Sequence, residues 1–453
     1  MKRLLLVLFL PLALLRAQEV SLSVPYERME LRNGLNVILH EDHTIPRVSV
    51  NMWYHVGSGH EKPGRTGFAH LFEHIMFEGS GNVPEGMFDV WLEAAGGDNN
   101  GSTNGDRTNY YENMPGNALE LALFLESDRM GYLLDAMSPQ KVDGQRDVVK
   151  NERRQRYENQ PYGMVWIVMA QNIYPKDHPY SWPTIGSMAD LSAASYEDVV
   201  EFFKKYYVPN NTSMVIAGDI NVEQTKKLVT KWFDEIPAGK PNEPIDPPAS
   251  SITSEKRLMM EDRVQLPRFY MSWLTPPLLT PGDAEMDILA NILAGGKNSR
   301  LHKRLVYDLQ IAQDVSAFQS SASLSSSFWV IATARAGHTL AELETVIQEE
   351  INRLKVDGPT DREVQRAINQ FEAAFLDGLE TSAGKADQLN NYFVRTGNPD
   401  YFNEDLARYK AVRRNDVQAM ARSFLPDGAR VVLSIVPQGK KDLSAAASME
   451  VKP

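Results

Sequence analysis

The segment from His70 to His74, His-Leu-Phe-Glu-His, contains the residue types that hold a metal ion and move a proton. On an α-helix, His70 and His74 project from the same face because they are four residues apart, so they can share one ion. Glu73 lies on the same side, where a general base for an activated water must be. This spacing is the inverted form of the common zincin motif, and it predicts Zn²⁺-dependent hydrolysis. The alternative is a pair of surface histidines on an amphipathic helix.

A catalytic zinc ion also needs a third protein ligand and an open position for water. The chain contains no cysteine, so this ligand must be another histidine or a carboxylate. The best candidate is Glu152, in a predicted helix that begins near Ser138-Pro139, where serine can cap the helix and proline suits its first turn. Arg153 and Arg154 follow directly, which also fits a carboxylate in a surface ion pair. Spacing alone leaves other carboxylates open as the third ligand.

The helix that must present the motif has the pattern of one buried face. Its apolar residues lie at positions 68, 71, 72, 75 and 76. Thr66 can cap its start and Gly79 can end it. The sequence therefore predicts a short helix that holds Glu73 outside its apolar face.

The composition limits the class of protein. A chain of 453 residues, 43% hydrophobic and 23% charged, is long enough for two or three globular domains. Residues 1–17 have a basic start and an apolar run from Leu4 to Leu15, shorter than the roughly 20 residues that span a membrane. They predict a secretory signal peptide, with an uncleaved anchor as the alternative. The formal net charge of −12 argues against nucleic-acid binding, which needs a basic surface.

The remaining chain divides into parts of similar size. The proline-rich segment 237–254 cannot form a helix interior or a central strand, so it predicts a linker. It would join an N-terminal domain, residues 25–236, to a C-terminal domain, residues 255–440. Residues 441–453 are small and polar, and they predict a mobile tail.

The two predicted domains have similar sequences. Ile45-Pro46-Arg47 and its following strand resemble Leu266-Pro267-Arg268 and the strand after it, and the ends of the domains match at nearly the same offset. A sustained offset indicates an internal duplication, with chance similarity of short strands as the alternative. Strands grouped with long helices predict an α+β fold, in which each domain is a mostly antiparallel sheet covered by helices on one face.

Together these features resemble the pitrilysin, insulin-degrading enzyme and mitochondrial processing peptidase family of inverzincin metallopeptidases, over about residues 25–440. In that family, a glutamate roughly 75 to 80 residues after the inverted motif completes the zinc site. Here the segment from Arg146 to Arg153 occupies that place. The resemblance implies one Zn²⁺ per chain, with Glu152 as the third ligand beside His70 and His74.

A second similarity lies in the segment from Gly96 to Thr103 and its continuation to Tyr111. It looks like the edge strand with which the family pairs the substrate backbone, and Asn100 and Gly101 occupy the substrate-contacting positions. An exposed edge can add a peptide as an extra strand with little demand on its sequence. Without the family, the same residues would predict only a loop and a turn.

Two departures from the family matter. The family often has a further glutamate seven residues before the third ligand, and here that position is Gln145, which can hydrogen-bond a ligand but adds no charge. The family's C-terminal half usually carries an Arg and a Tyr, seven residues apart, that help bind substrate. Here those positions are Val306 and Gln313. Arg304 and Tyr307 are near in sequence but out of register, so on a helix they point elsewhere.

These features predict a zinc-dependent endopeptidase that cleaves short or unfolded peptides, with Glu73 as the general base. In two-subunit family members one chain carries zinc and a homologous partner carries the Arg and Tyr, so we expect this chain to be the catalytic subunit of a heterodimer. The alternative is a peptide-binding or structural scaffold subunit with little activity alone. The signal peptide predicts export, with the periplasm favoured over full secretion, and no later segment predicts a membrane span.

Overall fold

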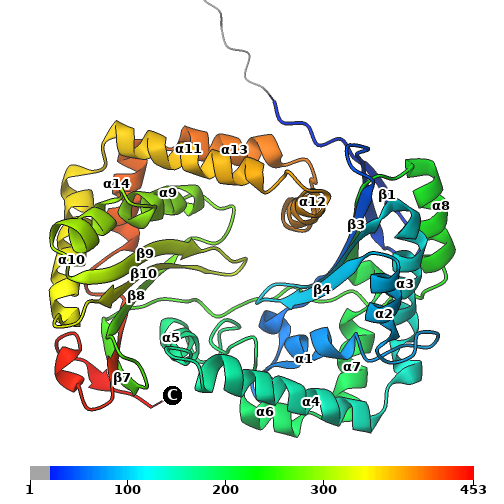
Figure 1. Cartoon of the computed structure of the whole chain (residues 1–453), viewed down its shortest axis with the longest axis horizontal. Helices are drawn as coiled ribbons and strands as arrows, with labels where there is room; N and C mark the ends of the chain where they lie inside the picture. The colour runs from blue at the N-terminus through cyan, green and yellow to red at the C-terminus, as the bar shows by residue number, and fades with distance from the viewer. Residues whose placement is uncertain (1–20, 453) are drawn as a thin grey trace, which may run out of the picture.

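The computed structural model describes residues 21–452, so the predicted signal peptide, residues 1–17, lies outside the described residues. The chain forms two halves, each built on a six-stranded mixed sheet with helices packed against it (Figure 1). Within the described part, no helix has both the length and the apolar character needed to cross a membrane.

The N-terminal half contains the first sheet, with its strands in the order β1-β2-β6-β3-β5-β4. The strands are β1 (Glu27–Glu30), β2 (Asn36–Glu41), β3 (Arg47–Tyr54), β4 (Asp98–Thr103), β5 (Thr108–Pro115) and β6 (Thr212–Gly218). The helices are α1 (Phe68–Ile75), α2 (Met87–Ala94), α3 (Leu119–Ala136), α4 (Pro139–Arg153), α5 (Val165–Ile173), α6 (Met188–Ala193), α7 (Tyr196–Tyr206) and α8 (Val222–Phe233).

The C-terminal half contains the second sheet, in the order β12-β7-β11-β8-β10-β9. The strands are β7 (Lys256–Asp262), β8 (Arg268–Thr275), β9 (Ala312–Ser320), β10 (Ser326–Ala334), β11 (Val431–Pro437) and β12 (Met449–Glu450). The helices are α9 (Asp283–Ala294), α10 (Leu340–Asp357), α11 (Asp361–Asp377), α12 (Ser382–Thr396), α13 (Phe402–Ala411) and α14 (Arg414–Phe424).

The two sheets have the same internal topology. In the first, β6 pairs parallel with β2 and antiparallel with β3; in the second, β11 pairs parallel with β7 and antiparallel with β8. Each sheet continues through antiparallel pairings to an edge strand, β4 in one half and β9 in the other. The predicted α+β fold with two homologous halves is therefore confirmed.

The second face of each sheet holds a feature that the sequence did not predict. Helix α12 of the C-terminal half packs on β3 and β6, and α5 of the N-terminal half packs on β8 and β11 (Figure 1). Strand β6 is buried on both faces for this reason: Met214 and Ile216 face its own helices, whereas Val215 and Ala217 face the core beneath α12. The two halves thus exchange one helix each.

The predicted linker has no regular secondary structure, whereas the predicted tail forms part of the second sheet. No helix or strand forms between α8 and β7, in the region predicted as a linker. Residues 441–452, for which the sequence predicts a mobile tail, instead pack on the second sheet. Strand β12 pairs parallel with the edge of β7, and Ala445 is buried in the C-terminal core. The free edge of β7 offers backbone groups that this tail can pair with, which local composition did not indicate.

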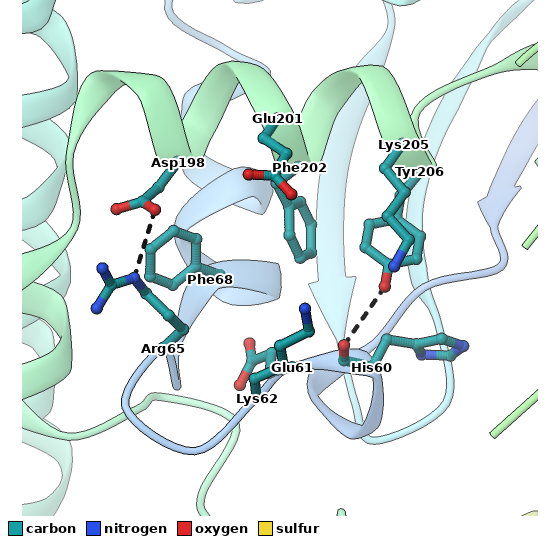
Figure 2. Close-up of a pocket in the computed structure, with 10 residues that line it drawn as sticks. All are labelled: His60, Glu61, Lys62, Arg65, Phe68, Asp198, Glu201, Phe202, Lys205 and Tyr206. Atoms are coloured by element: carbon teal, nitrogen blue, oxygen red, sulfur yellow. Dashed lines mark hydrogen bonds and ion pairs between the residues drawn. The ribbon is translucent and has the colours of Figure 1, made fainter. Parts of the chain in front are cut away.

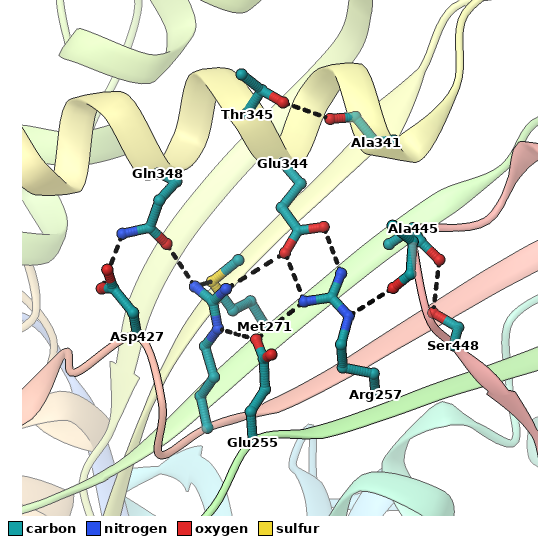
Figure 3. Close-up of polar contacts among 12 residues, drawn as sticks. Glu255, Arg257, Met271, Ala341, Glu344, Thr345, Gln348, Asp427, Ala445 and Ser448 are labelled. Atoms are coloured by element: carbon teal, nitrogen blue, oxygen red, sulfur yellow. Dashed lines mark hydrogen bonds and ion pairs between the residues drawn. The ribbon is translucent and has the colours of Figure 1, made fainter.

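A polar network fixes the point where the linker enters the second sheet. Arg257 donates two hydrogen bonds to Glu344 on α10 and one to Glu255, just before β7 (Figure 3). Arg430, just before β11, donates to the same Glu255 and to Gln348. These charge-assisted bonds join β7, β11 and α10 at one end of the C-terminal half.

Candidate metal centre

Helix α1, which carries the motif, follows Gly67, whose φ of 90° is in the left-handed region. The helix is capped by Glu61, whose carboxylate accepts hydrogen bonds from the N–H groups of Gly67 (2.9 Å) and Ala69 (2.8 Å). The predicted cap, Thr66, instead donates to Asp190 (2.5 Å). The cap prediction was wrong because Glu61 reaches the helix start from an earlier turn of the chain, a contact that does not follow the local pattern.

The other end of α1 also differs from the prediction. The helix ends at Ile75 rather than near Gly79, which has a φ of 87° in the turn that follows.

A pocket lies behind helix α1, between its preceding loop and α7, where Phe68 and Phe202 lie beside the ion pair of Arg65 and Asp198 (Figure 2). None of the motif residues His70, Glu73 and His74 lines it.

The structure brings His70, His74 and Glu152 together. The Nε2 atoms of His70 and His74 lie 3.6 and 3.2 Å from Glu152 Oε2, and the candidate ligand atoms of the three residues are all within 4.8 Å of one another. Donor atoms bound to one tetrahedral zinc ion at its usual bond lengths are about 3.4 Å apart. The donor set and its spacing therefore fit Zn²⁺, with two ligands from α1 and one from α4.

The protonation states of His70 and Glu152 suit metal binding. Burial, with His74 nearby, lowers the pKa of His70 to about 4, which keeps its imidazole neutral. The hydrogen bond with His74 lowers the pKa of Glu152, outweighing its burial. Arg156, on the π-helical turn after α4, pairs with the other oxygen of Glu152 (2.8 Å). Neutral imidazoles and an ionised carboxylate are the forms that bind a metal cation.

Glu73 lies beside this centre and has a partner that sequence analysis missed. Thr103 Oγ1, at the end of β4, donates to Glu73 Oε2 at 2.6 Å. Burial raises the pKa of Glu73, against the opposing effect of this hydrogen bond. Thr103 belongs to the segment singled out as an edge strand, but only the folded sheet shows that it touches Glu73. Such a bond fixes the direction of the carboxylate while leaving its other oxygen available.

Asn100 and Gly101 lie in β4, at the edge of the first sheet, so this segment is a strand rather than a loop. A Cβ at Gly101 would lie 3.0 Å from Glu73 Cγ and 3.3 Å from the Tyr110 ring, so a larger residue here would press on the motif glutamate. An open pocket beside the metal centre is lined by Glu73, His74 and Phe77 together with residues 97–101. The centre and the edge strand therefore share one surface.

The hydrogen-bond register decides which main-chain groups of β4 are free. At the turn, Asn104 N–H donates to Arg107 O at 3.0 Å, and bonded pairs alternate with non-bonded pairs along an antiparallel ladder. The main-chain groups of Asn100 and Ser102 therefore point toward β5, and Arg107 Nη1 also donates to Ser102 O at 2.8 Å. Those of Gly101 and Thr103 point away from β5, and within the described residues they have no strand beside them.

The two departures from the resembled pattern also have defined positions. Gln145 Nε2 donates to Glu78 Oε1 at 2.5 Å, on the segment after α1. In the C-terminal half, Val306 packs against the core and Gln313 is exposed on β9.

The nearby Arg and Tyr do not reach the metal centre. Arg304 pairs with Glu349 and Glu350 on α10. Tyr307 is 52% exposed in the π-helical segment His302–Asp308. The structure therefore does not bring these two residues to the motif.

Comparison with known proteins places this site in a family. Residues 36–174 match the family described as Insulinase (Peptidase family M16), and residues 193–371 match the Peptidase M16 inactive domain. The chain therefore belongs to peptidase family M16, which confirms the resemblance drawn from its motifs.

Relatives and a solved structure agree over nearly the whole chain. The zinc protease PqqE of Helicobacter pylori is 28% identical over 424 residues, 91% of this chain and 93% of the relative. The probable mitochondrial-processing peptidase subunit beta of Arabidopsis thaliana is 25% identical over 441 residues, 94% and 81% of the two chains. The crystal structure of a protease from Helicobacter pylori superposes with a TM-score of 0.84 at 25% identity, covering 92% of this chain and all of that one.

Proposed function

We propose that this protein is a zinc-dependent endopeptidase whose metal ion is held by His70, His74 and Glu152. The observation that carries the proposal is the convergence of these three residues from two helices, with Glu73 and the edge strand β4 beside them. When bound, Zn²⁺ would polarise the scissile carbonyl and make the attacking water more acidic. Glu73 takes the proton of that water and passes it to the departing amine nitrogen.

The edge strand supports a peptide substrate without strong sequence preference. A peptide added to β4 would bond to outward-facing main-chain groups such as those of Gly101. Gly101 lets that peptide and Glu73 approach closely. Because only an extended backbone can pair in this way, short or unfolded polypeptides are the proposed substrates.

The test of the catalytic proposal is the variant Glu73→Gln. It should keep bound zinc and fold normally, but cleavage of a quenched peptide should fall by roughly 10²- to 10⁴-fold, the usual contribution of a general base. The matched control is Glu85→Gln, which makes the same change at a mostly exposed carboxylate paired with Lys141. Wild-type turnover by Glu73→Gln would rule out Glu73 as the base.

We also propose that the chain works with a homologous subunit. Val306 and Gln313 stand where the family usually has its Arg and Tyr, and Arg304 is engaged with α10. A second chain would then supply that pair, and each zinc-bearing chain would hold one ion. Full peptidase activity from this purified chain alone would contradict the need for a partner.

The second candidate function is a scaffold or peptide-binding subunit. It is supported by the match of residues 193–371 to a domain described as inactive, and by Val306 and Gln313. Zinc content and peptide cleavage separate the two functions. A scaffold would bind peptide along β4 without cleaving it, even with the zinc site filled and a partner present.

Export is a further part of the proposal. Residues 1–17 would be removed as a signal peptide, and the mature protein, with domains 25–236 and 255–440 joined by 237–254, would act in the periplasm. Determination of the mature N-terminus after fractionation tests this. An intact Met1 in a cytoplasmic fraction would contradict it.

A further inference from the structure

The hairpin formed by β4 and β5, called the substrate hairpin below, is bonded to the C-terminal half of the molecule. Residues 104–107 form the turn between β4 and β5, directly after Thr103. Asp106 lies at this turn, and its Oδ2 accepts hydrogen bonds from the N–H (3.1 Å) and hydroxyl (2.9 Å) of Ser323, between β9 and β10. The same oxygen lies 3.2 Å from Arg395 Nη2 on α12. Three bonds from the C-terminal half thus converge on one carboxylate of the substrate hairpin.

Tyr180 strengthens this junction from the N-terminal half. Its hydroxyl donates to the other oxygen of Asp106 and accepts the N–H of Leu324 at 3.1 Å. Asp106 therefore has both oxygens satisfied, and Arg395 also donates to Ser323. Charge-assisted bonds of this kind at a largely buried position are strong and directional.

The turn is also held tightly to its own half. The N–H of Ser58 donates to Asn104 O (2.9 Å) and that of Gly59 to Gly105 O (2.8 Å). A Cβ at Gly57 would lie 2.4 Å from Asn104 O, so the two segments are in direct backbone contact. The turn is therefore fixed both by backbone contacts within its own half and by the bonds from the C-terminal half at Asp106.

The hairpin reaches the general base within three residues. Thr103, three positions before Asp106, donates to Glu73, and Arg107, one position after it, holds Ser102 O. The direction of the Glu73 carboxylate and the free edge of β4 thus both depend on this turn. A displacement of about 1 Å at a reacting group can cost roughly 10²-fold in rate.

We propose that Asp106 is a positioning residue. By bonding the substrate hairpin to the C-terminal half, it keeps β4, Thr103 and Glu73 in the geometry that catalysis needs. The inference rests on the proposed peptidase function for its kinetic readout. It means that Glu73 and β4 are correctly placed only while the C-terminal half is bonded to the substrate hairpin. The C-terminal half itself carries no motif residue.

The structure offers a matched control for the contact of Asp106 with the C-terminal half. Asp42, directly after β2, pairs with Lys385 on the same helix α12. The side chains of Asp42 and Asp106 are equally buried, with 15% and 14% exposed. Both ion pairs join α12 to the N-terminal half, but Asp42 lies away from the β4–β5 hairpin. Asp106→Asn and Asp42→Asn therefore make the same change in the same interface.

The experiment compares these two variants of the full chain, with its partner present if activity requires one. Asp106→Asn should lower kcat by roughly 10- to 100-fold with unchanged zinc content and a KM within about threefold of wild type. Asp42→Asn should lower the melting temperature by about as much as Asp106→Asn does, but it should leave kcat within about twofold of wild type. Arg395→Gln should behave as Asp106→Asn does, and Arg395→Lys, which keeps the charge, should recover part of the activity.

Amide hydrogen exchange provides a readout that does not depend on cleavage. Exchange in residues 98–115 should be faster in Asp106→Asn than in wild type, and unchanged in Asp42→Asn. Equal kinetic losses in the two variants, or unchanged exchange in the hairpin of Asp106→Asn, would overturn the inference. If the zinc-loaded wild type cleaves no peptide, the proposed function fails, and hairpin exchange alone still decides whether Asp106 holds β4. If Asp106→Asn does not fold, Arg395→Gln gives the same decision.

Discussion

Helices α1 and α9 hold equivalent places in the two halves. Helix α1 follows β3 and packs beside the edge strand β4, and α9 follows β8 and packs beside the edge strand β9. Helix α1 carries the two histidines and the glutamate of the motif, whereas α9 has no histidine. On α9, Asp283 pairs with Arg408 and Asp287 accepts a hydrogen bond from Tyr409.

This difference shows that the scaffold does not by itself specify metal chemistry. The same arrangement of helix and edge strand carries a candidate metal centre in one half and an internal polar network in the other. A few side chains on α1, completed by Glu152 on α4, make the difference. The comparison can be tested by changing one half at a time.

The largest expected effect follows from removing a metal ligand. His74→Ala should lose bound zinc and reduce peptide cleavage by roughly 10³-fold or more, because one of the three protein donors is gone. The control is His338→Ala in the C-terminal half, where the histidine pairs with Glu342. Metal analysis and peptide cleavage measure the result. Stoichiometric zinc in His74→Ala would contradict the assigned centre.

The second prediction compares buried arginines in the two halves. Arg129 is fully buried with Glu112 and Glu126 in the N-terminal half. Arg129→Met leaves two buried carboxyl groups without their cation and should cost about 3–5 kcal/mol in the free energy of unfolding. In the C-terminal half, Arg257 remains beside Glu255 and Glu344, so Arg430→Met should cost only about 1–3 kcal/mol.

Denaturant unfolding of both arginine variants measures this difference. Aromatic rings add to the expected loss in the N-terminal half, since Phe77, Phe88 and Tyr110 all lie within 5.2 Å of the Arg129 guanidinium. Equal losses in the two variants would show that the paired arrangement around Arg430 gives no compensation.

The third prediction concerns the contact between β4 and α1. Gly101→Ala places a methyl group 3.0 Å from Glu73 Cγ, so Glu73 must move, and kcat should fall by roughly 10- to 100-fold with the zinc retained. Gly144→Ala is the control, because a Cβ at that position of α4 meets no atom within 4 Å. Steady-state kinetics of both variants decide the matter. An unchanged kcat in Gly101→Ala would mean that this contact does not position the base.

The last prediction is a pH dependence that belongs to α9. Burial raises the pKa of Asp287 to about 7, so the folded protein keeps this carboxyl protonated where the unfolded chain has lost the proton. Its contribution to stability is complete below about pH 4 and is lost as the pH rises to about 7, on the order of a few kcal/mol. Asp287→Asn keeps an acceptor for Tyr409 but cannot ionise. The stability difference between wild type and variant should therefore change between pH 4 and 7 and stay constant above 7, as measured by urea unfolding.

Much of the fold was predictable because its signals repeat along the chain. The strand after Arg47 and the strand after Arg268 share an alternating pattern, and both occupy the same place in their sheets. Local composition was a poorer guide to the ends of elements. Thr66 looked like a helix cap but bonds to Asp190, and the small polar tail pairs with β7, because a distant partner decided each case.

The sequence by itself determined the two histidines and the glutamate of α1, since helical spacing alone sets them on one face. Tertiary structure decided what completes the site. Glu152 reaches His74 across 78 residues, and Thr103 reaches Glu73 across 30. Asp106 is held by Ser323 and Arg395, 217 and 289 residues away. No local pattern encodes such contacts, because they depend on how two sheets and their exchanged helices pack against each other.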